Sequence, residues 1–418
     1  MDGETYKKTV LDNGIKVITE EVPYFNSASI GFWVNTGSQN EDTSNNGVSH
    51  FIEHLFFKGT KNHSASEIAE IMDSVGGHLN AFTEKEQTCY YARVTDRHIP
   101  LAFDILSDML LHSLLAPKDI EKEKGVVLEE IKMYEDSPDE MVFEIFTQGL
   151  WDGHPLGRST LGSREVIKSL TRKDLMKYIG KNYVPQNMIV SAAGRLEHDR
   201  IVELVDKLFG KLKKTSVEAF PKTPVVKKKH IVKYKDCEQV YLCMGSTGIS
   251  ARDESKYKLS ILDSILGGSM SSRLFQEIRE RRGLVYTVMT FQNSYKDAGL
   301  FGIYAGTSMK SLKKVMDLCV KIMGDIREKG VSAKELSRAK EHIKGAILLA
   351  LESTANRMIR LAKGEVYHGR LIPHEEIIEK LEAVTLEDVH KIARKILNYK
   401  NYSVAVLGPV DKDFKIEI

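Results

Sequence analysis

Three residues in one apolar stretch have the types and spacing of a metal site. In "GVSHFIEHLFFKGT", residues 47–60, His50, Glu53 and His54 lie among aliphatic and aromatic residues. Residues i and i+4 of a helix project from one face about one turn apart, so both imidazoles could bind one tetrahedral zinc ion. Glu53 lies on the same side but displaced, where it could accept a proton from a water on the metal. The alternative is a buried polar network without metal.

Two histidines leave zinc short of a ligand, because catalytic zinc sites usually have three protein ligands and a water. A helix expected at 117–135 offers Glu123, Glu129 and Glu130. Glu123 and Glu130 are seven residues apart and share a helical face, whereas Glu129 points about 100° away. Spacing alone does not choose among the three, and a solvated acidic face is the alternative. We expect one zinc ion per chain.

The elements that must position these residues form an α+β pattern. Ser64 and Glu67 predict a capping box, and Gly59 closes the helix that carries the histidines. In the first half we expect strands within 6–35 and 78–94 and helices at 45–58, 65–75, 97–115 and 117–135. This mixture predicts a mostly antiparallel sheet packed with helices, an α/β sandwich.

The chain reads as two related halves. Residues 171–194 and 385–408 both begin with a Thr-x-x-Asp helix start and end in a buried-strand pattern with Gly, and residues 29–38 parallel 241–250. We therefore predict two homologous domains, with limits at 1–212 for the domain with the metal site, 213–230 for a polar linker and 231–418 for a second domain without ligands. Chance likeness between any two α/β units is the alternative.

The second half serves as an internal control for the metal site. The parallel between the halves places Ile261, Ser264 and Ile265 opposite His50, Glu53 and His54, in that order. The second copy thus keeps the helix without the ligands, which indicates that the histidines serve chemistry rather than packing.

Composition excludes several classes of protein. The 418 residues are 42% apolar and 28% charged, with a net charge of +2, which is too small to indicate nucleic acid or an anionic membrane as the main partner. No apolar run approaches the roughly 18 residues of a membrane span. The charged start lacks a signal-peptide core, so we expect a cytoplasmic protein. The four cysteines show no CxxC pattern and are expected to be reduced thiols.

"HFIEH", "GGHLNAFTEKEQTCYY" and "KEKGVVLEEI" together resemble the pitrilysin/insulinase superfamily of zinc metallopeptidases. The likeness is greatest to its short members, the mitochondrial processing peptidases and related bacterial processing proteases. This resemblance implies that His50, His54 and Glu130 bind zinc and that Glu53 is the general base. It also implies that Glu123 assists the site.

The same resemblance implies residues for substrate. Asn80 and Ala81 match an edge strand where a peptide pairs through its backbone, although a plain core strand is the alternative. Arg279 and Tyr286, in "LFQEIRERRGLVYTV", match an Arg/Tyr pair that holds the substrate; an exposed Arg and a half-buried Tyr are the alternative.

The expected function is that of a zinc endopeptidase acting on peptides or unfolded segments. Family members enclose their substrate in a chamber of four such domains, so a homodimeric clamshell is expected, with Arg279 and Tyr286 acting on the partner's site. A non-catalytic structural or partner-binding subunit, or a metal-storage or regulatory site, are the alternatives.

Overall fold

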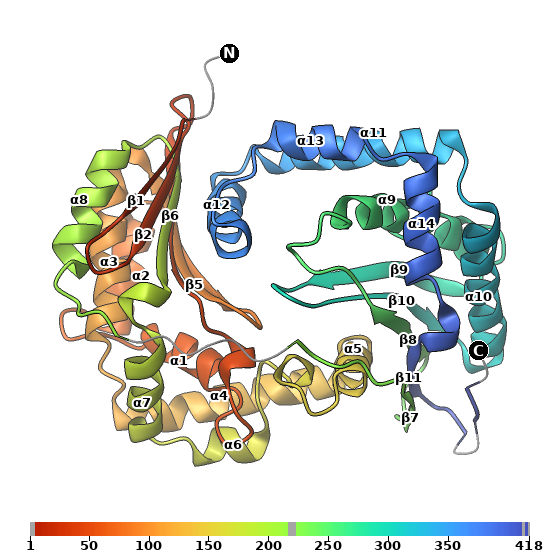
Figure 1. Ribbon diagram of the computed structural model, residues 1–418. Coiled ribbons are helices and arrows are strands. Elements are labelled where there is room, and N and C mark those ends of the chain that lie inside the picture. Colours follow the sequence, from red (N-terminus) through yellow and green to blue (C-terminus); the bar gives the residue numbers. More distant parts are fainter. Residues whose placement is uncertain (1–4, 216–222, 412–413, 417–418) are drawn as a thin grey trace. The chain divides into compact units, whose positions relative to one another are not determined.

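The chain forms two compact units, each with its own sheet and core (Figure 1). The computed structural model describes residues 5–215, 223–411 and 414–416. The first unit comprises Met1–Ile131, Arg158–Pro221 and Ala350–Leu371, and the second comprises Lys132–Gly157, Lys222–Leu349 and Ile372–Ile418. The predicted α+β class, with two sheets that are mostly antiparallel, is confirmed.

The sheet of the first unit has the strand order β1-β2-β6-β3-β5-β4. Only β2 and β6 pair in parallel; the other neighbours are antiparallel. The strands are β1 (Thr5–Val10), β2 (Lys16–Glu21), β3 (Ser27–Val34), β4 (His78–Thr83), β5 (Thr88–Thr95) and β6 (Met188–Gly194). β4 therefore forms one edge of this sheet.

Helices cover both faces of this sheet. They are α1 (Val48–Phe56), α2 (Ala65–Ser74), α3 (Ile99–His112), α4 (Pro117–Asp136), α6 (Arg164–Ser169), α7 (Arg172–Asn182), α8 (His198–Phe209) and α12 (Thr354–His368). Because side chains alternate across a strand, Val190 and Ala192 of β6 enter the core beneath α3 and α8. Ile189 and Ala193 face the opposite way and pack against Met358 of α12.

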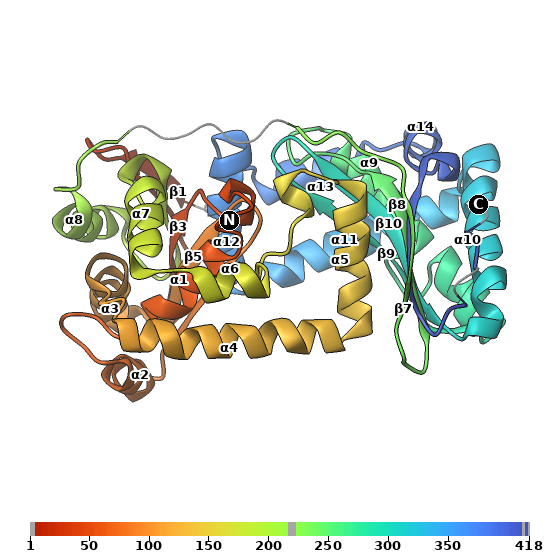
Figure 2. The same cartoon turned by 90° about the horizontal axis from the view of Figure 1, so that it is seen from below.

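The second unit repeats this plan with the strand order β7-β11-β8-β10-β9. Here only β7 and β11 are parallel. The strands are β7 (His230–Tyr234), β8 (Val240–Thr247), β9 (Val285–Ser294), β10 (Gly299–Thr307) and β11 (Ser403–Gly408). The helices are α5 (Pro138–Leu150), α9 (Lys256–Leu266), the short π-helix η5 (Phe275–Glu280), α10 (Leu312–Lys329), α11 (Ala333–Ala350), α13 (His374–Glu382) and α14 (Leu386–Ile396). Figure 2 shows the same elements from below.

The predicted domain limits, 1–212 and 231–418, differ from these units because each half gives one helical segment to the other. α12 belongs to the first unit, where Met358 and Leu361 contact the sheet face that carries Trp33. α5 belongs to the second unit, where Phe146 packs against the face that carries Cys243. The physical reason is that both faces of each sheet are apolar, and the helices of one half cover only one of them.

Strand pairing does not decide the comparison of the two helices. Ala193 pairs with Ser29 in the first sheet, and Leu407 pairs with Tyr241 in the second. The segments that join strand to helix differ in length, since residues 35–47 separate β3 from α1 and residues 248–255 separate β8 from α9. The placement of Ile261, Ser264 and Ile265 opposite His50, Glu53 and His54 therefore stays a prediction; all three lie on α9 and are buried.

Local predictions agree closely with the structure. Ser64 and Thr171 cap α2 and α7 as capping boxes with Glu67 and Asp174, and Thr385 does the same for α14. The expected linker, 213–230, includes residues 216–222, which lie outside the described residues, and its last residue, His230, begins β7. The four cysteines are free thiols. In the described residues, no helix is long and apolar enough to cross a membrane.

Candidate metal centre

The helix α1 is held at its start by a buried carboxylate. Gly47 precedes the helix with φ of 97°, a conformation that glycine adopts without strain. Glu41 accepts hydrogen bonds from the backbone N–H of Gly47 at 2.7 Å and of Ser49 at 2.8 Å, which satisfies donors that a helix start leaves open. Phe51 and Leu55 anchor the helix in the core. The orientation of the face with the histidines is therefore fixed by packing and by this cap.

His50, His54 and Glu130 come together as three groups that could hold a metal ion. One ligand atom from each lies within 4.8 Å of the others. Oε2 of Glu130 is 3.7 Å from Nε2 of His50 and 3.5 Å from Nε2 of His54. Ligands about 2.0–2.1 Å from a tetrahedral zinc lie about 3.3–3.4 Å apart, so the three atoms are close to the spacing that one zinc ion requires.

The chemistry of these groups also fits a metal. Oε2 of Glu130 is buried and has no hydrogen-bond partner among the described residues, although it faces two imidazole nitrogens. Burial, together with repulsion from His54, lowers the pKa of His50 to about 4. His50 is therefore neutral at pH 7, which is the form that binds zinc. A buried acceptor beside a neutral imidazole is a costly arrangement unless a cation completes it.

Glu53 lies beside this cluster but is not one of its three ligand groups. Thr83, the last residue of β4, donates a hydrogen bond from Oγ1 to Oε2 of Glu53 at 2.5 Å. Burial raises the pKa of Glu53, while the bond from Thr83 acts in the opposite direction. A carboxylate with a raised pKa and one oxygen fixed by a neighbour has the properties of a general acid–base group.

Glu123 has a different position from Glu130, and the structure separates the three acids of α4. Oε2 of Glu123 is 3.3 Å from Nδ1 of His54, and its Oε1 is 2.9 Å from Nζ of Lys58. Glu123 is almost fully buried, whereas Glu129 is exposed on another face of α4. Glu123 therefore contacts Nδ1 of His54, whereas Glu130 faces Nε2 of the same ring, and a carboxylate in that position commonly orients a histidine that binds a metal. Nδ1 of His50 has no corresponding partner among the described residues.

Asn80 and Ala81 lie on the edge strand β4, as predicted. They pair with Tyr91 and Tyr90 of β5 on one side, and no strand in the described part of the chain pairs with the other side. Oδ1 of Asn80 accepts the backbone N–H of Ala81 at 2.8 Å, which occupies a donor at this edge. The same strand ends at Thr83, so the edge and the contact to Glu53 belong to one element.

Arg279 and Tyr286 belong to the second unit, whereas the three ligand groups belong to the first. The Arg279 guanidinium lies 5.2 Å from the centre of the Tyr286 ring and 4.8 Å from that of Phe275, within the range of cation–π contacts. Tyr286 is 75% exposed. The predicted Arg/Tyr pair is thus formed, with its phenol open to solvent.

Three further residues of the site escaped sequence reasoning, namely Glu41, Lys58 and Thr83. Lys58 stands four residues after His54, a helical spacing that could have placed it on the same face. Glu41 and Thr83 carry no such signal, because they reach α1 only through the packing of a loop and a strand.

Comparison with known proteins finds protein families and relatives that match most of the chain. The family described as Insulinase (Peptidase family M16) matches residues 16–164, and the family described as Peptidase M16 inactive domain matches residues 169–343. The protein named uncharacterized zinc protease YmxG, from Bacillus subtilis, is 40% identical over 96% of this chain and 98% of its own length. The protein named uncharacterized zinc protease SCO5738, from Streptomyces coelicolor, is 36% identical over 97% of this chain and 90% of its own length.

Solved structures share the fold. The structure of a protease from Helicobacter pylori has a TM-score of 0.89 at 22% identity and covers 97% of this chain and all of that one. A Pseudomonas fluorescens structure titled as a peptidase M16 inactive domain has a TM-score of 0.91 at 20% identity, over 99% of this chain and all of that one. At these identities the likeness concerns the fold alone.

Proposed function

Because this chain belongs to the insulinase family of M16 peptidases, with relatives named as zinc proteases, we propose that it is a zinc-dependent endopeptidase that cleaves peptides or unfolded segments. The observation that carries the proposal is the convergence of His50, His54 and Glu130 at zinc-ligand spacing, with Glu53 beside them. These three residues would hold the ion. When bound, zinc supplies Lewis-acid chemistry: it polarises a carbonyl and lowers the pKa of water.

Glu53 is the proposed proton carrier. Its carboxylate accepts the proton of the attacking water and then donates it to the amine that leaves the cleaved bond. Thr83 fixes one oxygen of Glu53 through its hydroxyl, so the other oxygen is presented for the proton transfers. Burial raises the pKa of Glu53 towards the pH at which a group can both take and give a proton.

Glu123 and Lys58 are the proposed positioning pair. Lys58 holds one oxygen of Glu123, and the other oxygen contacts the ring nitrogen of His54 that faces away from the ligand cluster. This chain of contacts fixes both the tautomer and the rotation of the imidazole.

The open edge of β4 is the proposed place for substrate. A peptide that pairs there would be held by main-chain hydrogen bonds, which do not depend on its sequence, and would lie along the strand that ends at Thr83. On binding, the N–H of Ala81 would donate its hydrogen bond to a carbonyl of the peptide instead of to Oδ1 of Asn80. Such binding requires an extended chain, which favours peptides and unfolded segments over folded proteins.

Arg279 and Tyr286 are proposed to contribute to peptide binding from the second unit, in a homodimer that encloses the substrate. Subunit mixing tests this proposal. If the pair acts on the partner's site, mixing inactive Glu53→Gln with impaired Arg279→Ala restores cleavage, because one site in the mixed dimer keeps both groups. No recovery, in a mixture shown to exchange subunits, would contradict action on the partner.

The central experiment measures bound zinc and cleavage of a quenched peptide library. The wild type should contain zinc and cleave, and Glu53→Gln should contain zinc and lose about 10²–10⁴-fold in rate. Glu70→Gln, an exposed carboxylate on α2, is the matched control and should behave as wild type. Zinc without any wild-type cleavage would instead support a partner-binding or metal-regulatory protein.

A further inference from the structure

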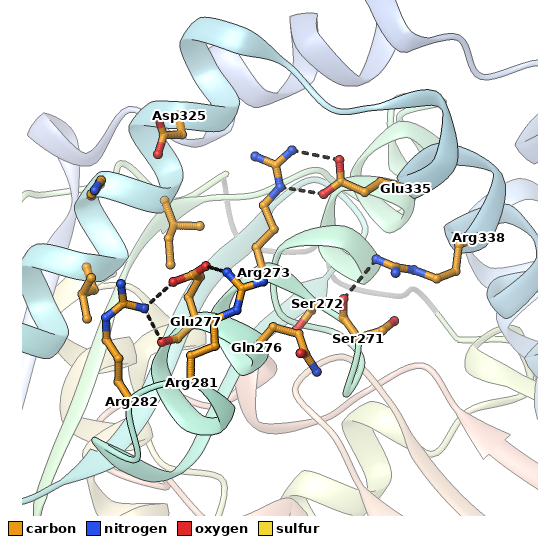
Figure 3. A pocket seen from close by; sticks show the side chains of 13 residues that line it. Ser271, Ser272, Arg273, Gln276, Glu277, Arg281, Arg282, Asp325, Glu335 and Arg338 are labelled. Carbon is orange, nitrogen blue, oxygen red and sulfur yellow. Dashed lines mark hydrogen bonds and ion pairs between the residues drawn. The ribbon is translucent and has the colours of Figure 1, made fainter.

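The second unit contains a pocket of about 570 Å³ that is separate from the residues of the metal centre (Figure 3). Its wall is formed by the turn before η5, by η5 and the two arginines that follow it, and by one side each of α10 and α11. The volume lies within the range of pockets that bind small molecules.

The lining of this pocket is unusually rich in charge. Five cationic and three acidic side chains line it: Arg273, Arg281, Arg282, Lys321 and Arg338, with Glu277, Asp325 and Glu335. One pair is structural, since the guanidinium of Arg273 donates to both oxygens of Glu335 at 2.7 and 2.9 Å, and this contact lowers the pKa of Glu335 to about 2. That bidentate pair is neutral and joins α11 to the turn before η5.

The remaining lining charges do not balance. Arg281 and Arg282 both pair with the single carboxylate of Glu277, so one positive charge stays uncompensated there. Asp325 pairs with Lys329 outside the pocket, at 2.6 Å. Lys321 forms no ion pair among the described residues, although Asp325, four residues on in α10, is near enough for Lys321 to help lower the pKa of Asp325.

Arg338 adds a further positive charge. Its guanidinium donates to the backbone carbonyl of Ser271 at 3.0 Å, and it has no acidic partner within ion-pair distance in the described part of the chain. Ser272 in the pocket wall also has a buried hydroxyl without a hydrogen-bond partner among those residues. The five cations and three acids of the lining thus leave a net charge of +2 around one cavity, which also has an unused hydroxyl in its wall.

We propose that this pocket binds a small anion with several phosphate groups, such as the polyphosphate chain of a nucleoside triphosphate. Guanidinium groups bind phosphate oxygens through paired N–H donors, and a lysine adds a point charge. A triphosphate carries enough negative charge to balance the net charge of +2, whereas a single carboxylate does not. The lining cations come from residues 281–282 after η5, from α10 and from α11, so a ligand with several anionic groups can contact more than one of them.

Titration calorimetry of the full-length protein with sodium tripolyphosphate tests the proposal without using peptidase activity. We expect one ion bound per chain and an affinity that falls as sodium chloride rises. The double variant Lys321→Gln/Arg338→Gln should weaken binding at least tenfold. The matched control Lys314→Gln/Lys334→Gln removes two exposed lysines from the same two helices, outside the pocket, and should change the affinity less than twofold.

Four results would overturn the proposal. The first is no binding at low salt. The second is equal weakening by the pocket pair and the control pair. The third is binding that the pocket pair leaves unchanged, which would place the anion elsewhere, for example at the metal centre. The fourth is a glutamate peptide of equal charge that binds as tightly as tripolyphosphate, which would overturn the assignment to phosphate. Unchanged thermal unfolding of both variants confirms that the fold is intact.

Discussion

Glu123 offers the sharpest test of how the metal centre is organised, because its two contacts predict a loss of zinc affinity. Oε2 lies 3.3 Å from Nδ1 of His54, and the side chain is almost fully buried. A hydrogen bond to a charged group contributes about 1.5–3 kcal/mol, and about 1.4 kcal/mol corresponds to a tenfold change in binding. Glu123→Ala should therefore raise the dissociation constant for zinc about 100-fold. Glu123→Gln keeps a neutral acceptor and should raise it about tenfold.

Competition with a chromogenic chelator gives these constants directly. The control is Glu129→Gln, which removes one carboxylate from the same helix at an exposed position and should leave the zinc affinity within twofold of wild type. Lys58→Met should resemble Glu123→Gln, since it releases the carboxylate that orients His54. If Glu123→Ala binds zinc as tightly as wild type, or if Glu129→Gln loses as much, the positioning argument is refuted.

Thr83→Val removes the hydrogen bond to Glu53, which contributes about 1 kcal/mol, and should therefore lower kcat about 3- to 10-fold while the zinc content stays unchanged. An unchanged kcat would contradict the role given to Thr83. Met358→Ala should lower the free energy of unfolding by about 2–4 kcal/mol in urea titrations, because Met358 is fully buried against the first sheet. The control Leu349→Ala, at an exposed position, should stay within about 0.5 kcal/mol of wild type. Glu335→Gln should lower the free energy of unfolding of the protein at pH 7. The bond to Arg273 lowers the pKa of Glu335 from 4.5 to about 2, so its contribution is complete above pH 4.5 and lost as pH falls towards 2. The difference in the free energy of unfolding between wild type and Glu335→Gln should thus shrink by about 1 kcal/mol between pH 7 and pH 4. A difference that does not change with pH would argue against the ion pair of Glu335 with Arg273.

The helix of the metal centre could be read from sequence because its signal is local. The spacing of His50, Glu53 and His54 sets which side chains share a face, and the apolar residues between them set which face is buried. The capping residues of α2 and α7 were predictable for the same reason, since a cap depends on residues three apart.

The choice between Glu123 and Glu130 was not available from spacing, because both lie on one face of α4 and differ only in their distance along it. That distance becomes meaningful once α4 is packed beside α1, which brings one acid to the Nε2 atoms and the other to Nδ1 of His54. Resemblance to a family supplied the assignment that local physics could not. The packing of α5 on the second sheet and of α12 on the first could not be predicted from the sequence either. The apolar stripe of each helix does not specify which of two similar sheets the helix covers.

That exchange has a consequence for the independence of the two halves. Neither half of the sequence contains every element of a compact unit, since α5 completes the second sheet and α12 completes the first. Either half alone would expose an apolar sheet face and a helix without its sheet, so each unit depends on both halves of the chain. A cut within residues 213–230 should accordingly yield two fragments that stay together until they unfold.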